Sequence, residues 1–576
     1  MTVEDEAFPQ SIRNIYLNNN QLRFSLRNTF SNLTNLATLR LDSNRISLIS
    51  STTFSNCSNL YSLSLRSNQI GWLNSSMFQD CVSLRFFYAS YNQIAYIGDD
   101  TFSHMPLSNL DLSYNKLTEL SNTSKDFHSK SFSFLWLRGN QLTSIRSNTF
   151  NKTSATSFYL NDNQIAYIDS NGFVDCSATQ LYLTSNPLKY IRSYAFNRGT
   201  YYNLYMQGSE IRHLPSHAFY DISGTYLRLE NNQIRYIEEE AFYVRYTYLY
   251  LHDNNLLDIA GTMFTHGSSV SNSLYLHRNA LTVLLPATFV GLSAFAVSLS
   301  YNKLITYPGD ALSVLNLQTI DLSFNEISVI PDDSFINSDT LKVLNLEGNF
   351  ITHLQDNLLY KAVLLEKLSF TNNSITYVAE GLLNNNPKVD EIYLTRNKIY
   401  HLPRIAARND SLVIHLDLNP VSSISANAFD YLDDKSSVIL NTESLQCGCA
   451  AYISLTLSNV EVTGRSATCA FPPSVAGISL LTNSPDKVKR NDFLCAPIDL
   501  EFEQPNINVI SLSWTLDKEA NYDFDVTAAK QRLVIFYSYS HNYIFSTSTV
   551  YHEFLPNINI TSIYIELMLG IMKLIF

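Results

Sequence analysis

The hydrophobic residues of the chain recur with a period of about 23 to 24 residues from the N-terminal region to about residue 440. The pattern is clear in NLATLRLDSNRI (35–46), NLQTIDLSFNEI (316–327) and TLKVLNLEGNFI (340–351), which share the consensus LxxLxLxxNxL. Side chains alternate between the two faces of a strand, so the leucines of LxL point one way and the residue between them points the other. Each unit is therefore predicted to contain one short strand with a hydrophobic core face.

An asparagine follows the strand of almost every unit and defines 18 repeats. Its column runs through Asn20, Asn44, Asn68, Asn92, Asn115, Asn140, Asn163, Asn186, Ser209 as a substitute, Asn232, Asn254, Asn279, Asn302, Asn325, Asn349, Asn373, Asn397 and Asn419. The amide both donates and accepts hydrogen bonds, which suits it to hold backbone groups where the chain leaves the strand. Such units stack on their neighbours, so we predict a solenoid with one parallel inner sheet, about 85 Å long.

A second column, mostly phenylalanine, lies ten residues after the asparagine. It comprises Phe30, Phe54, Phe78, Phe102, Phe150, Phe173, Phe196, Phe219, Phe242, Phe264, Phe289, Phe335 and Phe429, with Leu312, Leu359 and Leu383 in other repeats. These rings are predicted to form a spine behind the sheet that keeps adjacent coils at a uniform spacing by stacking and burial.

Both columns resemble the typical, Phe-spined leucine-rich repeats of animal ectodomains. The resemblance implies an α/β leucine-rich-repeat solenoid, which is a horseshoe with a concave parallel β-sheet and a mostly irregular or short-helical convex side. We assign residues 1–440 to this array. Phe8 belongs to the phenylalanine column although residue 1 falls midway through a unit. The expectation is therefore that the chain begins inside a repeat and that an N-terminal cap is missing.

The seven cysteines fall into two groups. Cys57, Cys81 and Cys176 each lie thirteen residues after a repeat asparagine, in a column that is otherwise apolar. They are predicted to be buried core thiols, with a Cys57–Cys81 bridge as the less favoured alternative.

The second group lies in residues 441–496 and resembles the cysteine-rich C-terminal cap of extracellular repeat proteins. That resemblance implies the pairs Cys447–Cys469 and Cys449–Cys495, although Leu445 stands where the family usually has Trp. A zinc site is the alternative, but the Cys-x-Cys spacing fits zinc fingers poorly. Because disulfides persist in oxidising compartments, the cap predicts an extracellular or cell-surface location.

Eight Asn-x-Ser/Thr sequons agree with secretion, although chance alone supplies about that many in so Asn- and Ser-rich a chain. They are Asn32, Asn56, Asn74, Asn122, Asn151, Asn372, Asn409 and Asn559.

The segment 497–576 contains three stretches of alternating hydrophobicity and is predicted to form a partial all-β sandwich. Trp514 and Tyr564 resemble the core anchors of a fibronectin type III domain, although the stretch from Leu555 to Tyr564 departs from that family's pattern.

The net charge of -12 and the absence of a basic run argue against nucleic-acid binding. The first six residues carry three acids and resemble no secretory signal, and the apolar end of the chain is too short to span a bilayer. Membrane attachment is therefore expected only through a segment missing from this chain, and the sequence leaves homo-oligomerisation open.

The residue between the two leucines, four positions before each asparagine, is predicted to face the concave side. In the middle repeats this position is occupied by Trp136, Tyr159, Tyr182, Tyr205, Arg228, Tyr250 and Tyr275, and neighbouring concave positions add Tyr226, Tyr248, His252 and Arg278. Tyr, Trp and Arg are enriched in protein-binding hot spots, so these eleven residues are the predicted ligand-binding face. The alternative is a self-supporting ladder, in which aromatic residues on adjacent strands stack only on one another.

We therefore predict a binding module of a cell-surface receptor or adhesion protein with a protein ligand. The alternatives are the ectodomain of a Toll-like pattern-recognition receptor and a structural extracellular-matrix repeat protein. Motifs of hydrolases, nucleotide-binding enzymes and zinc proteases are absent, so neither an enzyme nor a cofactor is predicted. His252 and His277, one repeat apart beside Asp253, are compatible with a metal, but ordinary surface polarity is the favoured interpretation and no metal site is predicted.

Overall fold

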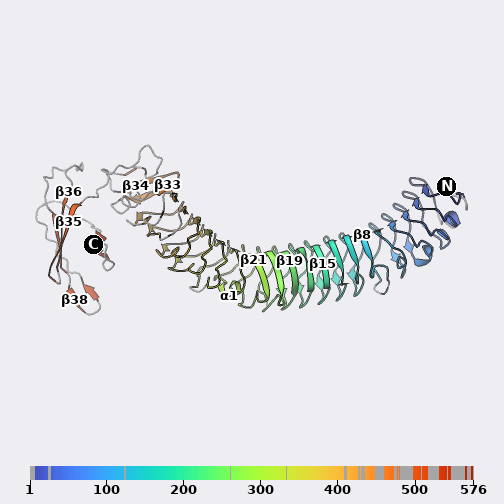
Figure 1. The fold of residues 1–576 in the computed structure, drawn as a ribbon, viewed down its shortest axis with the longest axis horizontal. Helices are drawn as coiled ribbons and strands as arrows, with labels where there is room; N and C mark the ends of the chain where they lie inside the picture. Colours follow the sequence, from blue (N-terminus) through green and yellow to red (C-terminus); the bar gives the residue numbers. More distant parts are fainter. Residues whose placement is uncertain are drawn as a thin grey trace.

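The structure is a computed structural model. It describes residues 7–23, 28–121, 123, 125–259, 261–331, 334–405, 407, 411–425, 428–429, 432, 435–447, 460–471, 476–477 and 479, and seven strands between residues 497 and 574. The repeats form a shallow arc of stacked coils, with the short helix α1 (Gly309–Leu312) on its outer side (Figure 1). The predicted leucine-rich-repeat solenoid is confirmed.

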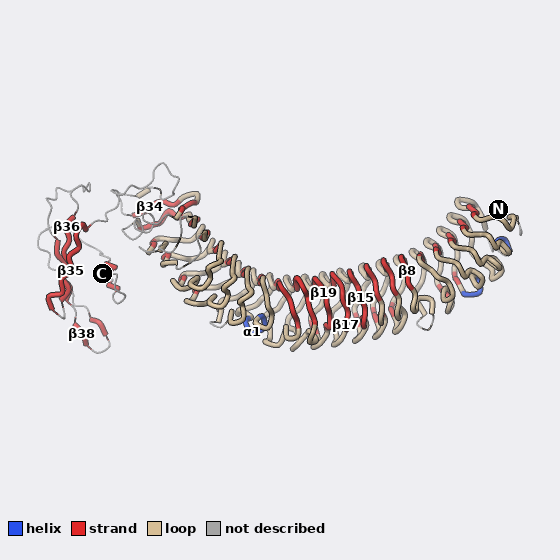
Figure 2. Tube along the Cα trace, in the orientation of Figure 1, coloured by secondary structure: helices blue, strands red, loops and turns tan. Residues whose placement is uncertain are grey.

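One 21-stranded sheet runs along the whole arc of coils (Figure 2). Its strands are β1 (Asn14–Tyr16), β2 (Thr38–Arg40), β3 (Ser62–Ser64), β5 (Phe86–Tyr88), β7 (Asn109–Asp111), β8 (Ser131–Trp136), β10 (Ser154–Tyr159), β12 (Phe173–Val174), β13 (Ser177–Tyr182), β15 (Phe196–Tyr205), β17 (Phe219–Arg228), β19 (Phe242–Tyr250), β20 (Ser268–Tyr275), β21 (Leu292–Ser298), β22 (Thr319–Asp321), β23 (Val343–Asn345), β25 (Lys367–Ser369), β27 (Glu391–Tyr393), β29 (Val413–His415), β31 (Ser437–Ile439) and β33 (Glu461–Thr463). Each coil pairs in parallel with the next, so that Ile15, Leu39 and Leu63 are register partners.

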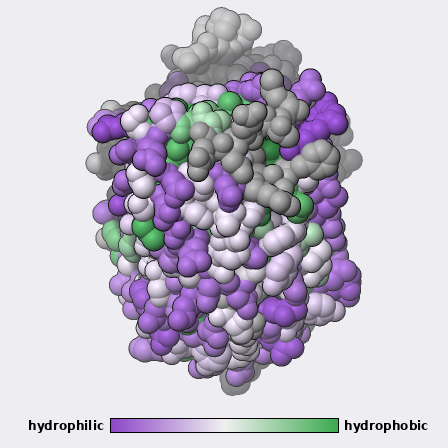
Figure 3. Space-filling view, turned by 90° about the vertical axis from the view of Figure 1, so that its right-hand side faces the viewer, coloured by the Kyte–Doolittle hydropathy of each residue, from purple (hydrophilic) through white to green (hydrophobic). Residues whose placement is uncertain are grey.

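The outer and lateral parts of the coils contain little regular structure, as predicted. The described helices are α1 and the 3-10 turns η1 (Asn28–Phe30) and η2 (Ser75–Met77). Two-residue strands mark one flank of the solenoid, namely β4 (Trp72–Leu73), β6 (Tyr96–Ile97), β9 (Ser144–Ile145), β11 (Tyr167–Ile168), β14 (Tyr190–Ile191), β16 (His213–Leu214), β18 (Tyr236–Ile237), β24 (His353–Leu354), β26 (Tyr377–Val378), β28 (His401–Leu402) and β30 (Ser423–Ile424). Viewed end-on from the N-terminal side, the described surface is largely hydrophilic to neutral, with a few hydrophobic patches (Figure 3).

The phenylalanine spine is formed by stacked, buried rings. Phe8 stacks on Phe30 with ring centroids 5.9 Å apart, which confirms that Phe8 belongs to the column. Phe173 and Phe196 stack at 4.9 Å and an interplanar angle of 3°. One ring of the spine was missed from the sequence. Phe127 packs edge-to-face against Phe150, although it lies twelve rather than ten residues after its repeat asparagine.

The asparagine column ties successive coils together. Asn44 Oδ1 accepts from the Leu22 N–H at 3.0 Å, and its Nδ2 donates to the carbonyls of Leu41 in its own coil and Leu17 in the preceding coil, both at 2.9 Å. The same three contacts recur further along the column, for example at Asn163 and Asn419. The predicted role of the column is confirmed.

The strands of the middle coils are much longer than those at the ends. β15 and β17 each have 10 residues and β19 has 9, whereas β2 and β22 each have 3. In the middle coils the strand starts at the spine phenylalanine and continues to the concave position, because segments rich in Thr, Tyr and Val connect the two. The middle coils therefore present a continuous sheet to the hollow.

Two large side chains fit into the core of this region because a glycine lies between them. Tyr201 and Tyr246 are fully buried, and Gly224 lies between their coils. A Cβ on Gly224 would lie 1.7 Å from the Tyr201 carbonyl oxygen and 2.7 Å from the Tyr246 ring. Backbone without a side chain is thus required at this position.

The cysteines of the repeats are buried free thiols, as predicted, and the alternative Cys57–Cys81 bridge is not formed. Burial raises the pKa of Cys57 to about 11. The Cys57 Sγ donates to the Phe30 carbonyl at 2.9 Å.

The sheet continues beyond residue 440, because β33, which lies inside the predicted cap segment, pairs with β31. The strands β32 (Thr442–Gln446) and β34 (Ala467–Phe471) pair in parallel there, and the predicted Cys447–Cys469 disulfide is formed. Cys449 and Cys495 lie outside the described residues, and so does the second predicted bridge.

Beyond residue 497, the antiparallel strands β35 (Pro497–Asn506), β36 (Val509–Leu516) and β37 (Gln531–Phe536) form a three-stranded sheet. The further strands are β38 (Ser538–Ser540), β39 (Tyr543–Phe545), β40 (Ile565–Glu566) and β41 (Lys573–Leu574). Trp514 lies in β36, Tyr564 lies outside the described residues, and the fibronectin type III assignment stays a prediction. Among the described residues, no helix has the length and apolarity needed to cross a bilayer.

Candidate binding face

Sheet register brings the predicted concave residues into one row. Tyr159 is the register partner of both Trp136 and Tyr182, Tyr182 pairs with Tyr205, and the row continues through the remaining middle coils. We call this row the aromatic column; it consists of Trp136, Tyr159, Tyr182, Tyr205, Arg228, Tyr250 and Tyr275. All seven side chains are half-buried.

The first half of the aromatic column is a face-to-face stack. Ring centroids are 6.3 Å apart between Trp136 and Tyr159, 4.9 Å between Tyr159 and Tyr182, and 4.7 Å between Tyr182 and Tyr205, with interplanar angles of 3° to 8°. Phe134 also stacks on Trp136, with ring centroids 4.8 Å apart. Because neighbours cover the ring faces, each ring exposes its edge to the hollow, and the edge carries positive partial charge.

Desolvation raises the pKa of both Tyr182 and Tyr250, and neighbouring tyrosines raise it further. Both phenols therefore stay protonated at neutral pH. The Tyr182 hydroxyl donates to Gln180 Oε1 at 2.9 Å.

Arg228 interrupts the stack without breaking it. Its guanidinium carbon lies 5.0 Å from the ring centroid of Tyr250, 5.9 Å from that of Tyr205 and 6.0 Å from that of Tyr226, which are cation–π distances. Its Nη1 contacts Glu230 Oε1 at 3.2 Å. Burial is the main cause that raises the pKa of Glu230, against the opposing effect of Arg228.

The second half of the aromatic column widens into a cluster. Tyr250 stacks on Tyr275 at 4.8 Å, and Tyr248 stacks on Tyr226 at 5.2 Å. Alongside them the imidazoles of His252 and His277 stack with centroids 4.3 Å apart and an interplanar angle of 14°.

A row of polar side chains follows the aromatic column, two residues further along each strand. Six of these side chains have a buried polar atom without a hydrogen-bond partner in the described part of the chain: Arg138 Nε, Asn161 Oδ1, Gln207 Oε1, Glu230 Oε2, His252 Nδ1 and His277 Nδ1. We call these six residues the polar row. Unsatisfied buried polar atoms are rare in folded proteins. Their concentration beside the aromatic column distinguishes this part of the sheet as a candidate binding site.

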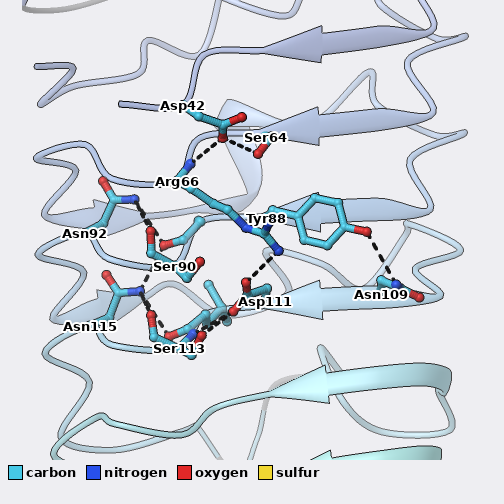
Figure 4. A network of polar contacts seen from close by, with 12 residues as sticks. Asp42, Ser64, Arg66, Tyr88, Ser90, Asn92, Asn109, Asp111, Ser113 and Asn115 are labelled. Atoms are coloured by element: carbon cyan, nitrogen blue, oxygen red, sulfur yellow. Dashed lines mark hydrogen bonds and ion pairs between the residues drawn. The ribbon is translucent and has the colours of Figure 1, made fainter. Parts of the chain in front are cut away.

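A second polar cluster lies on the same sheet near its N-terminal end. Arg66 reaches over Tyr88 to Asp111, and Asp42 accepts from Ser64 and from the Arg66 N–H (Figure 4). In contrast to the polar row, these side chains form hydrogen bonds and an ion pair with one another.

The structure places ten of the eleven predicted site residues together along β8 to β20 and their C-terminal ends. Arg278 is exposed and its guanidinium lies 5.7 Å from the ring centroid of Tyr301, at the edge of the face. Sequence reasoning missed Asn161 and Gln207 of the polar row. Their signal was positional, because both occupy the same column as His252, two residues before the repeat asparagine.

Family profiles agree with this architecture. The profile described as Leucine rich repeat matches residues 34–94 and 315–375, and that described as BspA type Leucine rich repeat region (6 copies) matches residues 123–249 and 167–275. The chain thus contains leucine-rich repeats in these segments and folds as a leucine-rich-repeat solenoid. The BspA-type span contains the long strands β8 to β20 and the whole aromatic column. No curated protein matches the chain.

One solved structure supports the same fold, and a second is similar over much of the chain at a lower TM-score. A chain of the glycosylated Drosophila Toll–Spatzle complex is 21% identical at a TM-score of 0.53, and the alignment covers 81% of this chain and 64% of that chain. The chain thus spans 64% of the length of that Toll complex chain. The ectodomain of the Arabidopsis thaliana receptor kinase GASSHO1/SCHENGEN3, in complex with CASPARIAN STRIP INTEGRITY FACTOR 2, is 17% identical at a TM-score of 0.37, covering 79% of this chain and 58% of that chain.

Proposed function

We propose that the chain is the ligand-binding module of a cell-surface receptor or adhesion protein, and that it recognises a protein ligand through the aromatic column. The observation that carries the proposal is the combination of seven half-buried column residues with the unsatisfied atoms of the polar row. A ladder that only supports the sheet needs the stacked rings but not the polar row. These atoms are enclosed by neighbouring side chains, so a partner gives them hydrogen bonds only when the side chains turn outward on binding.

Stacking and binding support each other in this arrangement. Rings held face to face lose little further side-chain freedom when a ligand covers them, and such preorganisation increases affinity. The exposed ring edges, the phenol groups and the guanidinium of Arg228 are complementary to carbonyl and carboxylate oxygens. A protein surface with backbone carbonyls and acidic side chains supplies those groups.

One observation supports an extracellular location, and the positions of the sequons are compatible with an accessible binding face. The Cys447–Cys469 disulfide is characteristic of an oxidising compartment. Sequons Asn32, Asn56 and Asn372 are exposed, and no sequon occurs between residues 152 and 371, a range that contains six of the seven positions of the aromatic column. Glycans attached at the sequons would thus leave most of the aromatic column uncovered.

The test compares two triple variants of the full chain against a panel of secreted and cell-surface ectodomains from the source organism. Tyr159→Ser, Tyr182→Ser and Tyr250→Ser together remove three of the five column tyrosines and are expected to weaken capture at least tenfold. The control replaces the exposed flank residues Tyr96, Tyr190 and Tyr377 by Ser and should capture like the wild type. Lower melting temperature with unchanged capture by the column variant would instead assign the column to sheet support.

A further inference from the structure

Three metal-ligating side chains meet at the C-terminal ends of two adjacent strands. His252 and His277 each follow by two residues the register partners Tyr250 and Tyr275 of β19 and β20, so they occupy equivalent places in adjacent coils. Asp253 is adjacent to His252 in the chain. One ligand atom from each of the three residues lies within 4.8 Å of the others.

We infer that His252, His277 and Asp253 form a binding site for a divalent transition-metal ion of the zinc type. Two imidazoles and one carboxylate are a ligand set that Zn²⁺ accepts, and they leave a fourth position open toward the hollow of the sheet. The inference does not depend on the proposed function, since the ion itself is the ligand.

Neither imidazole is held by another contact through its Nδ1, which has no hydrogen-bond partner in the described part of the chain for either His252 or His277. Imidazole binds a metal ion through a ring nitrogen that carries no proton.

The two imidazoles are close enough to share one ion once at least one ring turns. Two nitrogens bound to a tetrahedral Zn²⁺ at about 2.05 Å lie about 3.4 Å apart. The ring centroids of His252 and His277 are 4.3 Å apart with an interplanar angle of 14°. Because the lone pairs lie in the ring planes, at least one of the half-buried imidazoles must rotate out of the stack for both nitrogens to reach the same ion.

The charges around the site leave the Asp253 carboxylate weakly engaged. Its Oδ1 lies 3.8 Å from Arg278 Nη1 and its Oδ2 lies 3.7 Å from His252 Nε2, both beyond hydrogen-bond distance. Glu230 is paired with Arg228, and Asp321 adds a further acid facing His277. Three carboxylates thus face two guanidiniums around the imidazoles, a balance that favours a cation.

A histidine elsewhere on the sheet provides a comparison. His415 stacks on Tyr393 at 4.2 Å, and burial also lowers its pKa. Its charged neighbours include Glu391 and Asp417, and no metal-ligand cluster among the described residues includes it. It is therefore a half-buried, stacked histidine with acidic neighbours that lies outside the proposed site.

The experiment titrates the chelator-treated full chain with ZnCl2 alone by isothermal calorimetry. The wild type is expected to bind one Zn²⁺ that His252→Asn or His277→Asn weakens at least tenfold each, while His415→Asn leaves that affinity unchanged. Wild-type-like Zn²⁺ binding in His252→Asn and His277→Asn, or no binding by the wild type, would overturn the inference.

A second pair of variants tests the metal site even if an Asn variant folds poorly. His252→Cys retains a zinc ligand at the same place, so the Co²⁺-loaded variant should show the near-ultraviolet thiolate-to-cobalt absorption band. His415→Cys should lack that band. Equal spectra from the two cysteine variants would contradict the site.

Discussion

Arg66 and Asp111 form an ion pair across an intervening coil. The guanidinium carbon of Arg66 lies 4.3 Å from the ring centroid of Tyr88, and Nη2 donates to Asp111 Oδ2 at 3.0 Å (Figure 4). The Asp111 side chain is only 8% exposed, whereas that of Arg66 is 44% exposed. Removal of Arg66 therefore leaves a buried carboxylate with fewer partners, since only Ser113 then donates to it.

We predict that Arg66→Ala lowers the free energy of unfolding by about 1 to 2 kcal/mol, because the loss of a partner from a buried charge costs more than the pair contributes. The matched control is Arg146→Ala, whose ion pair with Glu119 has side chains 52% and 60% exposed. This change should cost less than about 0.5 kcal/mol. Urea denaturation of both variants measures the difference, and equal effects would contradict the assignment.

Ser209 replaces the asparagine in one repeat of the asparagine column. It is buried, and its hydroxyl has no hydrogen-bond partner among the described residues. By analogy with Asn186, an asparagine at 209 would accept from the Leu188 N–H and donate to the carbonyls of Met206 and Leu183.

We therefore predict that Ser209→Asn raises the free energy of unfolding by about 1 to 2 kcal/mol. The reciprocal change Asn186→Ser should lower it by a similar or larger amount. Thermal melts of the two variants are the measurement, and a destabilised Ser209→Asn protein would count against the analogy.

Gly224 is predicted to be irreplaceable even by alanine. A Cβ there would lie 1.7 Å from the Tyr201 carbonyl oxygen, so adjacent strands must separate, and we expect a loss of about 3 kcal/mol or more. Gly71→Ala is the control, since a Cβ at Gly71 meets nothing within 4 Å. Comparison of melting temperatures checks this, and comparable losses in both variants would refute it.

The burial of His415 leads us to predict that acidification lowers the stability of the protein. Burial lowers its pKa below the ordinary value of 6.5, so the unfolded chain binds a proton before the folded chain does as the pH falls. The contribution of this histidine to stability is therefore complete above pH 6.5 and decreases as the pH falls below that value. His415→Asn should show a smaller loss of melting temperature between pH 7 and pH 5 than the wild type. His353→Asn, on the exposed flank, should follow the wild type.

The fold could be predicted because the spacing of residues along the chain determines the geometry of each repeat. Tyr182 is placed on the concave face by counting four residues back from Asn186, and β13 confirms it because the leucines on either side are buried. Phe127 was missed for the converse reason, since its repeat is irregular and counting fails there. Counting residues could not predict the Arg66–Asp111 pair, because it depends on side-chain rotamers. It could not predict the length of β15 either, because that depends on pairing between coils, which the pattern of a single strand does not specify.

Tyr182 and Tyr205 provide the last prediction, because their stack at 4.7 Å and 5° tests whether the column acts as a unit. Offset-stacked aromatic pairs contribute about 0.5 to 1.5 kcal/mol beyond their burial, so Tyr182→Ala and Tyr205→Ala should be non-additive by about that amount in a double-mutant cycle. The control pair Tyr182→Ala and Tyr275→Ala should be additive, since three coils separate the rings. A coupling near zero for Tyr182 and Tyr205 would mean that the rings are held by their own strands. In that case the preorganisation on which the proposed binding function relies would have to come from the sheet backbone instead.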